Sequence, residues 1–153
     1  MYKNILVPLD GSKFAEGALE HVRAIAHERP VDKVFLVRVV EPLIMDVKNY
    51  IGLERSREAE DKLEADAKKY IEKTAADLRK EGIHIESKIV VDGEPAAKIL
   101  EAAKAENIDL IIMSTHGRSA FFHWVFGSVA HKVLVHSSVP ILVVPRKDKG
   151  GFR

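Results

Sequence analysis

The apolar residues of this chain follow two patterns that alternate from one segment to the next. Short apolar runs predict buried β-strands at residues 4–9, 34–40, 109–113 and 141–144, and a partly alternating run predicts an edge strand at 83–91. Between these runs, apolar residues recur at helical spacing over 13–28, 54–80 and 96–105, and again from just after Gly127 to about residue 136. Residues 43–53 have no clean period, and we expect a mobile surface segment there.

This alternation of strands and helices predicts an α/β fold: a single open five-stranded parallel sheet, Rossmann-like, with helices on both faces. We expect the strand order 3-2-1-4-5 and a domain at residues 1–146, followed by a flexible tail at 147–153. Ligands of such sheets bind at the carboxyl ends of the strands, where the strand order reverses. The reversal lies between the first and fourth strands, near Asp10 and Met113.

The connection that follows the fourth strand is unusually long. It covers about 13 residues, 114–126, whereas βα loops usually have about 2 to 6. It ends at Gly127-Ser128, where the next helical pattern begins and Ser128 is a natural N-cap. A helix start of this kind offers unpaired N–H groups to a phosphate, and Arg118 adds a cation. The alternative is an ordinary capped helix after a glycine turn. The loop also carries four aromatic residues, which argue against disorder: Phe121, Phe122, Trp124 and Phe126.

Two polar residues near this switch point have open interpretations. Asp10 follows the first strand and either holds an adenine or ribose group or only forms a turn. His116 either belongs to the site or bonds the backbone of its own loop. Ser128 has no visible base partner, so the sequence gives no indication of a nucleophile. We therefore predict no catalytic residue and no metal-ligating side chain.

Composition and missing motifs exclude several classes of protein. The chain has no cysteine, which rules out disulfides, zinc–thiolate sites and thiol catalysis. It has no Walker A sequence, no G-x-G-x-x-G after the first strand and no G-x-S-x-G. A net charge of +1 gives no reason to expect a nucleic-acid partner. No apolar run has the length of a membrane helix and no signal peptide is evident, so we expect a cytoplasmic protein.

Five segments together resemble the universal stress protein family. They are Ile5–Ser12, Val91–Pro95, Thr115–Ser119, Gly127–Ala130 and Val139–Val144. The ATP-binding branch of that family carries the pattern G-x2-G-x9-G-S/T. Here Ser114 replaces the first glycine, whereas Gly117 and the pair Gly127-Ser128 match.

The resemblance implies a site for ATP, accompanied by Mg or Mn, in a dimeric regulatory protein of the stress response. The family pattern assigns Pro8, Asp10 and Val39 to the adenine, Met113 and Ser114 to the ribose side, and Gly117, Gly127, Ser128 and Val129 to the phosphates. His116 and Arg118 complete the candidate site. The family also implies a homodimer, and the last strand, 141–144, would be an exposed sheet edge able to pair with a second copy.

Two other functions remain open at this point. A dimeric interaction module without nucleotide is favoured by Ser114: if the backbone there needs positive φ, a side chain costs roughly 1–2 kcal/mol. If the site needs only a close approach, a small serine is tolerated and its hydroxyl can bond the ribose. An ATP-consuming enzyme is the least supported, because the sequence offers no general base, although slow hydrolysis is compatible with bound metal and ATP. The protein partner and the inducing stress are not encoded in any motif.

Overall fold

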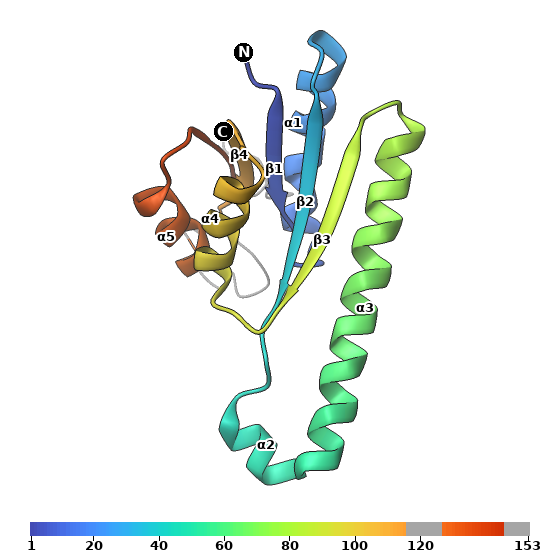
Figure 1. The fold of residues 1–153 in the computed structure, drawn as a ribbon, viewed down its shortest axis with the longest axis vertical. Helices are drawn as coiled ribbons and strands as arrows, with labels where there is room; N and C mark the ends of the chain where they lie inside the picture. Colours follow the sequence, from blue (N-terminus) through green and yellow to red (C-terminus); the bar gives the residue numbers. More distant parts are fainter. Residues whose placement is uncertain (116–126, 146–153) are drawn as a thin grey trace, which may run out of the picture.

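The structure, a computed structural model, describes residues 1–115 and 127–145 (Figure 1). Five parallel strands form one sheet in the order β3-β2-β1-β4-β5, which confirms the predicted topology. The strands are β1 (Asn4–Pro8), β2 (Lys33–Val40), β3 (Ile85–Val91), β4 (Leu110–Ser114) and β5 (Ile141–Val144). The helices are α1 (Lys13–Glu28), α2 (Met45–Ile51), α3 (Leu53–Lys80), α4 (Pro95–Ala105) and α5 (Ser128–His136). The tail predicted at 147–153 lies outside the described residues.

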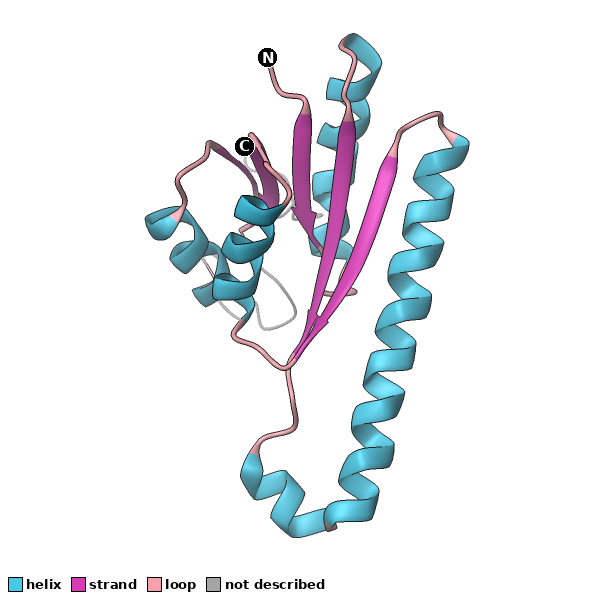
Figure 2. Cartoon of the chain, viewed as in Figure 1, coloured by secondary structure: helices cyan, strands magenta, loops and turns pink. Residues whose placement is uncertain are grey.

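The sheet lies between two helical layers, as Figure 2 shows. Side chains alternate across the sheet, so Ile5 and Val7 of β1 pack against α1 and α3, whereas Leu6 packs against α4 and α5. All three side chains are fully buried. Because both faces are covered, the central strands read as continuous apolar runs, which is why the sequence pattern located them.

A polar contact joins the two helices of the first layer. The Tyr70 hydroxyl on α3 donates a hydrogen bond to the Glu16 carboxylate on α1 over 2.9 Å. Burial, and then this carboxylate, raise the pKa of Tyr70 well above its usual range. The contact therefore joins α1 and α3 through a neutral phenol donor and a carboxylate acceptor at neutral pH.

Residues 43–53 differ from the prediction, because residues 45–51 form the helix α2. No residue of α2 is buried, so the helix has no apolar stripe that the sequence could reveal. The helix ends at Gly52, whose φ of 85° is one that glycine adopts readily. Residues 44–61, which comprise α2 and the start of α3, are called the arm below.

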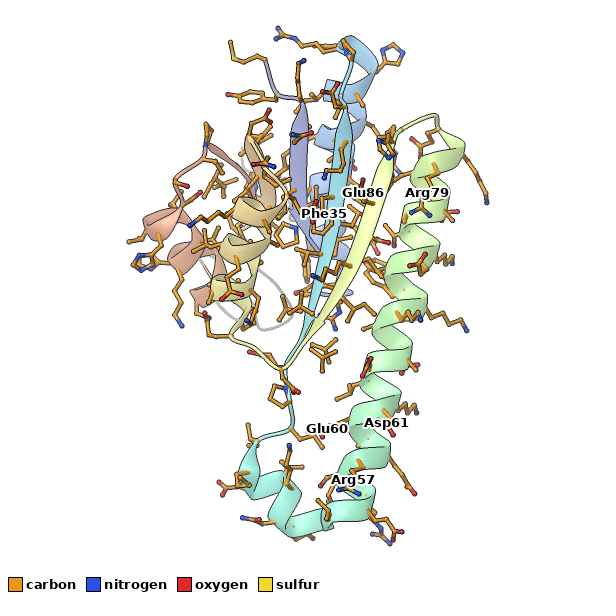
Figure 3. The ribbon with its side chains drawn as sticks, viewed as in Figure 1. Phe35, Arg57, Glu60, Asp61, Arg79 and Glu86 are labelled. Carbon is orange, nitrogen blue, oxygen red and sulfur yellow. The ribbon has the colours of Figure 1, made fainter. Side chains whose placement is uncertain are left out.

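The arm extends past the sheet because α3 is much longer than the strand beside it. At 28 residues α3 measures about 42 Å, whereas the seven-residue β3 measures about 23 Å. The apolar positions of α3 that are buried begin at Ala67 and continue to Leu78. Figure 3 shows the other end of α3, with Arg57, Glu60 and Asp61, lying beyond the sheet.

Internal polar contacts hold the arm together. The Glu60 carboxylate accepts hydrogen bonds from the Lys48 ammonium over 2.7 Å and from the Leu43 amide over 3.1 Å. The bond from Lys48, and then that from Leu43, lower the pKa of Glu60. The Ser56 hydroxyl donates to the Gly52 carbonyl over 2.7 Å. The arm is therefore a folded extension with its own fixed geometry.

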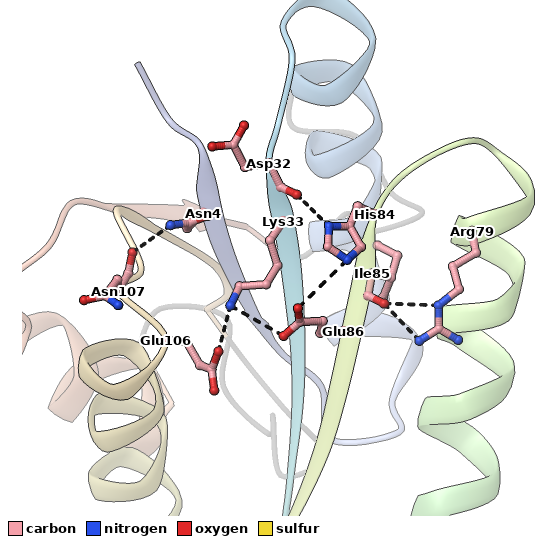
Figure 4. Close-up of polar contacts among 9 residues, drawn as sticks. All are labelled: Asn4, Asp32, Lys33, Arg79, His84, Ile85, Glu86, Glu106 and Asn107. Atoms are coloured by element: carbon pink, nitrogen blue, oxygen red, sulfur yellow. Dashed lines mark hydrogen bonds and ion pairs between the residues drawn. The ribbon is translucent and has the colours of Figure 1, made fainter.

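At the amino ends of the strands, an ionic cluster centred on Lys33 joins β2, β3 and the end of α4 (Figure 4). The Lys33 ammonium lies 2.7 Å from the Glu106 carboxylate and 3.5 Å from that of Glu86. It also lies 5.9 Å from the centre of the Phe35 ring. The hydrogen bond to Glu106 is the main reason that the pKa of Lys33 is raised.

Replacing Lys33 with methionine is expected to destabilise the protein by about 1–2 kcal/mol at neutral pH. Because the pKa of Lys33 is raised by folding, its ion pairs stabilise the fold fully at pH values below the pKa of lysine in the unfolded chain, about 10.4. This stabilisation is lost as the pH rises through the higher pKa of the folded state. The difference in free energy of unfolding between wild type and Lys33→Met should therefore shrink above that pH. Urea titrations at pH 8 and pH 11 measure it, and an equal difference at both would contradict the assignment.

Candidate nucleotide site

The sheet opens where the strand order reverses. The β1–β4 ladder pairs Ile5 with Leu110 and Leu6 with Ile111, and then stops. Both strands continue beyond it, β1 to Pro8 and β4 to Ser114, so their carboxyl ends separate. This divergence is the crevice that a doubly wound sheet forms at its switch point.

A pocket of about 400 Å³ occupies this crevice. Its volume falls within the range of about 300–1,000 Å³ that is usual for small-molecule sites. The described part of its wall is mainly apolar and comes from the ends of β1, β2 and β4 and from the helices α1, α3, α4 and α5. Its polar members are Asp10, Arg38, Glu41, Ser114, Thr115 and Ser128. An apolar wall with a few convergent polar groups is typical of a site that orients a small ligand.

The structure brings together eight of the eleven predicted site residues. Those that line the pocket are Pro8, Asp10, Val39, Met113, Ser114, Gly127, Ser128 and Val129. The other three, His116, Gly117 and Arg118, lie outside the described residues, as do the four aromatic residues of the same loop. Residues from four separate segments of the chain thus converge on one cavity.

Asp10 both forms a turn and lines the pocket. Its carboxylate accepts a hydrogen bond from the Ser12 amide over 2.9 Å, and Ser12 in turn caps α1 by accepting from the Ala15 amide over 3.2 Å. Gly11 between them has a φ of 84°, which favours glycine. The two interpretations of Asp10 are therefore compatible, because the turn holds the carboxylate at the edge of the pocket.

Ser114 is the last residue of β4 rather than part of the loop. It pairs with Val144 of β5 and is only 8% exposed. Among the described residues other than glycine, positive φ occurs at Asp92 and Asn107, so Ser114 adopts an ordinary strand conformation. The serine that replaces the family's glycine therefore imposes no backbone strain, so it bears on the site through the size and the hydroxyl of its side chain.

Ser128 is the first residue of α5 and not its N-cap, so the helix begins one residue earlier than the predicted cap at Ser128 would place it. Gly127 is the N-cap, with φ −57° and ψ 152°, and its amide donates to the Thr115 carbonyl over 2.8 Å. That bond pins the helix start to the end of β4. Because glycine has no side-chain oxygen, the first N–H groups of α5 lack the cap that serine or aspartate would supply.

The turn between β3 and α4 closes another side of the pocket through Pro95. The Glu94 carboxylate caps α4 by accepting from the Ala97 amide over 2.9 Å, and it also lies 3.2 Å from the Lys132 ammonium on α5. The backbone hydrogen bond from Ala97 is the main reason that the pKa of Glu94 is lowered. Glu94 thus links the start of α4 to α5.

Sequence reasoning missed several residues of the pocket wall. Arg38 interrupts the apolar run of β2, and Glu41 follows it directly. Charged residues near the end of a buried strand could have indicated that both line the site. Leu63 of α3 also lines the pocket. No local pattern marks Leu63, because its position depends on how far α3 extends along β3.

Within the described residues, no group of three or more His, Asp or Glu side chains is arranged to hold a metal ion. The same residues contain no helix with the length and apolar character that a membrane crossing requires.

Comparison with known proteins places the chain in a family. The model of the universal stress protein family matches residues 1–145, nearly the whole chain. This chain belongs to the universal stress protein family. The resemblance seen in the five sequence segments is thereby confirmed.

Individual universal stress proteins are similar to this chain along nearly its full length. Universal stress protein MJ0577 of Methanocaldococcus jannaschii is 33% identical over 160 residues, which cover 97% of this chain and 98% of the relative. The solved structure of MJ0577 superposes with a TM-score of 0.82 at 36% identity, covering 97% of this chain and 99% of the other. A universal stress protein from Archaeoglobus fulgidus, solved in complex with dAMP, has a TM-score of 0.67 at 25% identity, with 93% and 97% coverage.

Proposed function

We propose that this universal stress protein binds an adenine nucleotide, ATP in the first place, in the pocket between β1 and β4. The observation that carries this proposal is the convergence of eight predicted site residues on one cavity at the switch point of the sheet. Pro8 and Val39 supply apolar surface for a base, and Asp10 and Ser114 supply polar groups beside it. The uncapped start of α5 suits a phosphate group.

The choice of adenine rests on the relatives. The relative from Archaeoglobus fulgidus was solved with dAMP, an adenine nucleotide, and it shares the fold over nearly its whole length. ATP, rather than AMP, follows from the family pattern completed by Gly117, Gly127 and Ser128. We assign the accompanying Mg or Mn to no side chain, since the described residues offer no ligand set for it.

We propose a binding and regulatory role rather than rapid catalysis. Nucleotide occupancy would alter a surface that a protein partner recognises during the stress response. Turnover of ATP faster than about 1 per second would contradict this part of the proposal. Location in the cytoplasm stays a prediction from the sequence.

The nucleotide content of the purified protein tests the proposal. The protein is denatured and the supernatant is separated by anion exchange. We expect an adenine nucleotide at a molar ratio approaching one per chain, or else calorimetric binding of Mg-ATP with no comparable heat from Mg-GTP. Absence of nucleotide together with absence of binding at millimolar Mg-ATP would contradict the proposal and favour the interaction module.

We also propose that two copies pair through β5. In the described part of the sheet, β5 has β4 as its neighbour on one side and none on the other. Three of its four residues are only partly buried, and Leu134 and Val135 of the preceding helix are 43% and 60% exposed. An apolar edge strand of this kind is a template for pairing with an identical strand.

Replacing Val143 with lysine is expected to convert a dimer at low micromolar concentration into a monomer. A lysine on an edge strand opposes pairing because its charge would be buried between the two copies. The matched control is Val91→Lys on β3, the other edge strand, which should leave the dimer intact. Light scattering gives the mass, and a wild-type monomer, or a dimer of unchanged mass in Val143→Lys, would rule out this interface.

A further inference from the structure

The arm carries a group of large apolar side chains that the rest of the described fold leaves uncovered. Five of them lie within ten residues of one another at its tip: Ile44, Met45, Val47, Tyr50 and Leu53. Their exposed fractions run from 37% at Val47 to 91% at Tyr50. Folded proteins seldom leave such side chains together in water without a partner for them.

The position of the arm separates it from the interfaces already described. It projects beyond β3 at the bottom of Figure 1, whereas β5 lies at the opposite edge of the sheet. The ion pair between Lys48 and Glu60 joins α2 to α3, and the bond from the Ser56 hydroxyl to the Gly52 carbonyl closes the first turn of α3. The tip is therefore presented as a preformed surface rather than as a segment that must fold on binding.

Its charge excludes two kinds of partner. Residues 44–61 contain five acidic and three basic side chains, so the arm is net negative. Anionic membranes and nucleic acids bind clusters of basic side chains, and the arm has no such cluster. An amphipathic membrane anchor also needs lysine and arginine along its polar face, and α2 has a single lysine.

Its mixed charge and its area suit a second copy of the same chain. Acidic side chains at Asp46, Glu54 and Glu58 are interspersed with basic ones at Arg55 and Arg57, so a two-fold axis can place opposite charges against each other. The five side chains expose roughly 500 Å² in one copy, so two copies would bury about 1,000 Å², near the lower limit of specific interfaces. An interface of that size is weak.

We propose that the tip of the arm is a second self-association surface, on which two copies pack their arms together at high protein concentration. The contact is isologous and independent of β5. It joins molecules, or β5-linked pairs, into larger assemblies as the concentration rises. The nucleotide pocket takes no part in it.

Sedimentation velocity at about 5 and about 500 µM tests the proposal, since a small interface dissociates in the micromolar range or above. We expect the mass of the wild type to rise between these concentrations. The rise should be lost in the double variant Tyr50→Ser/Leu53→Ser, which changes only exposed side chains, and it should persist in Val91→Ser, where an apolar side chain is removed elsewhere. Val143→Lys should also keep the rise, because it affects the other interface.

Two results would overturn the proposal. One is a wild-type mass that does not change with concentration, or that rises equally in the double variant. The other is co-sedimentation of the wild type with vesicles of phosphatidylserine and phosphatidylcholine that the double variant abolishes, which would make a membrane the occupant. Far-ultraviolet circular dichroism of the double variant, expected to match the wild type, confirms that the arm remains folded.

Discussion

Replacing Ser114 with leucine is expected to lower the affinity for Mg-ATP by at least about 100-fold, or about 2.7 kcal/mol. Ser114 lines the pocket at the end of β4, so a leucine side chain would fill space that the ligand needs. The backbone at this position is an ordinary strand, and leucine meets no conformational strain there. Overpacking next to Met113 and Thr115 is expected to lower stability by about 1–3 kcal/mol.

The matched control at the same position is Ser114→Gly, which restores the family pattern. We expect its affinity for Mg-ATP to equal or exceed that of the wild type, because it removes a side chain and no hydrogen bond that the ladder with Val144 requires. Calorimetric titration measures the affinity of the wild type and of both variants for Mg-ATP, and thermal unfolding of each protein checks that it is folded. Equal affinity in S114L and wild type would contradict the location of the site. Binding by Ser114→Gly alone would mean that the serine has closed it.

Replacing Leu78 with alanine is expected to lower the free energy of unfolding by about 3–4 kcal/mol, or to lower the midpoint temperature by about 6–15 °C. Leu78 is fully buried in the core that α3 forms with α1 and the sheet. Losing three side-chain carbons there leaves a cavity that the surrounding strands cannot close.

The control for this prediction is the same substitution on the same helix. Leu63 is 40% exposed and lies before the first of the buried apolar positions on α3, so Leu63→Ala should cost about 1 kcal/mol or less. Urea denaturation without nucleotide compares the two, which avoids any effect of Leu63 on the pocket. Equal losses would mean that the N-terminal half of α3 packs against something that the isolated chain does not include.

The core of the fold was accessible from the sequence because buried parallel strands leave a strong signal. Each of the runs around Ile5, Leu36 and Ile111 is apolar on both faces, and each is buried on both faces in the sheet. The partial alternation at residues 83–91 likewise predicted an edge strand, and β3 (Ile85–Val91) is one. Topology then followed from the order of elements, since few arrangements satisfy a doubly wound sheet.

The site was partly accessible for the same reason. Pro8, Asp10 and Met113 stand at strand ends, and the topology alone brings those ends together. Leu63 could not be found in this way, since it comes from a helix whose reach along the sheet depends on side-chain packing. The boundary between Gly127 and Ser128 was misplaced by one residue, because both residue types are common N-caps and the bond from Gly127 to Thr115 is a long-range contact.

The helix α2 was missed for a different physical reason. Its formation depends on local hydrogen bonds and on the contact between Lys48 and Glu60, which lies twelve residues further along the chain. Without a buried face there is no hydrophobic period to detect. The same absence of burial leaves Tyr50 and Leu53 exposed and motivates the proposed self-association of the arm.

The most direct test of the central claim is a titration of the ¹⁵N-labelled protein with Mg-ATP, followed through the backbone amide signals. If the nucleotide binds between β1 and β4, the signals of Asp10, Val39, Ser114, Ser128 and Val129 should shift, whereas those of Leu53 in the arm and of Glu106 near the amino ends of the strands should not. Saturable shifts confined to other residues would place the nucleotide elsewhere, and no shift at millimolar Mg-ATP would contradict nucleotide binding by this chain.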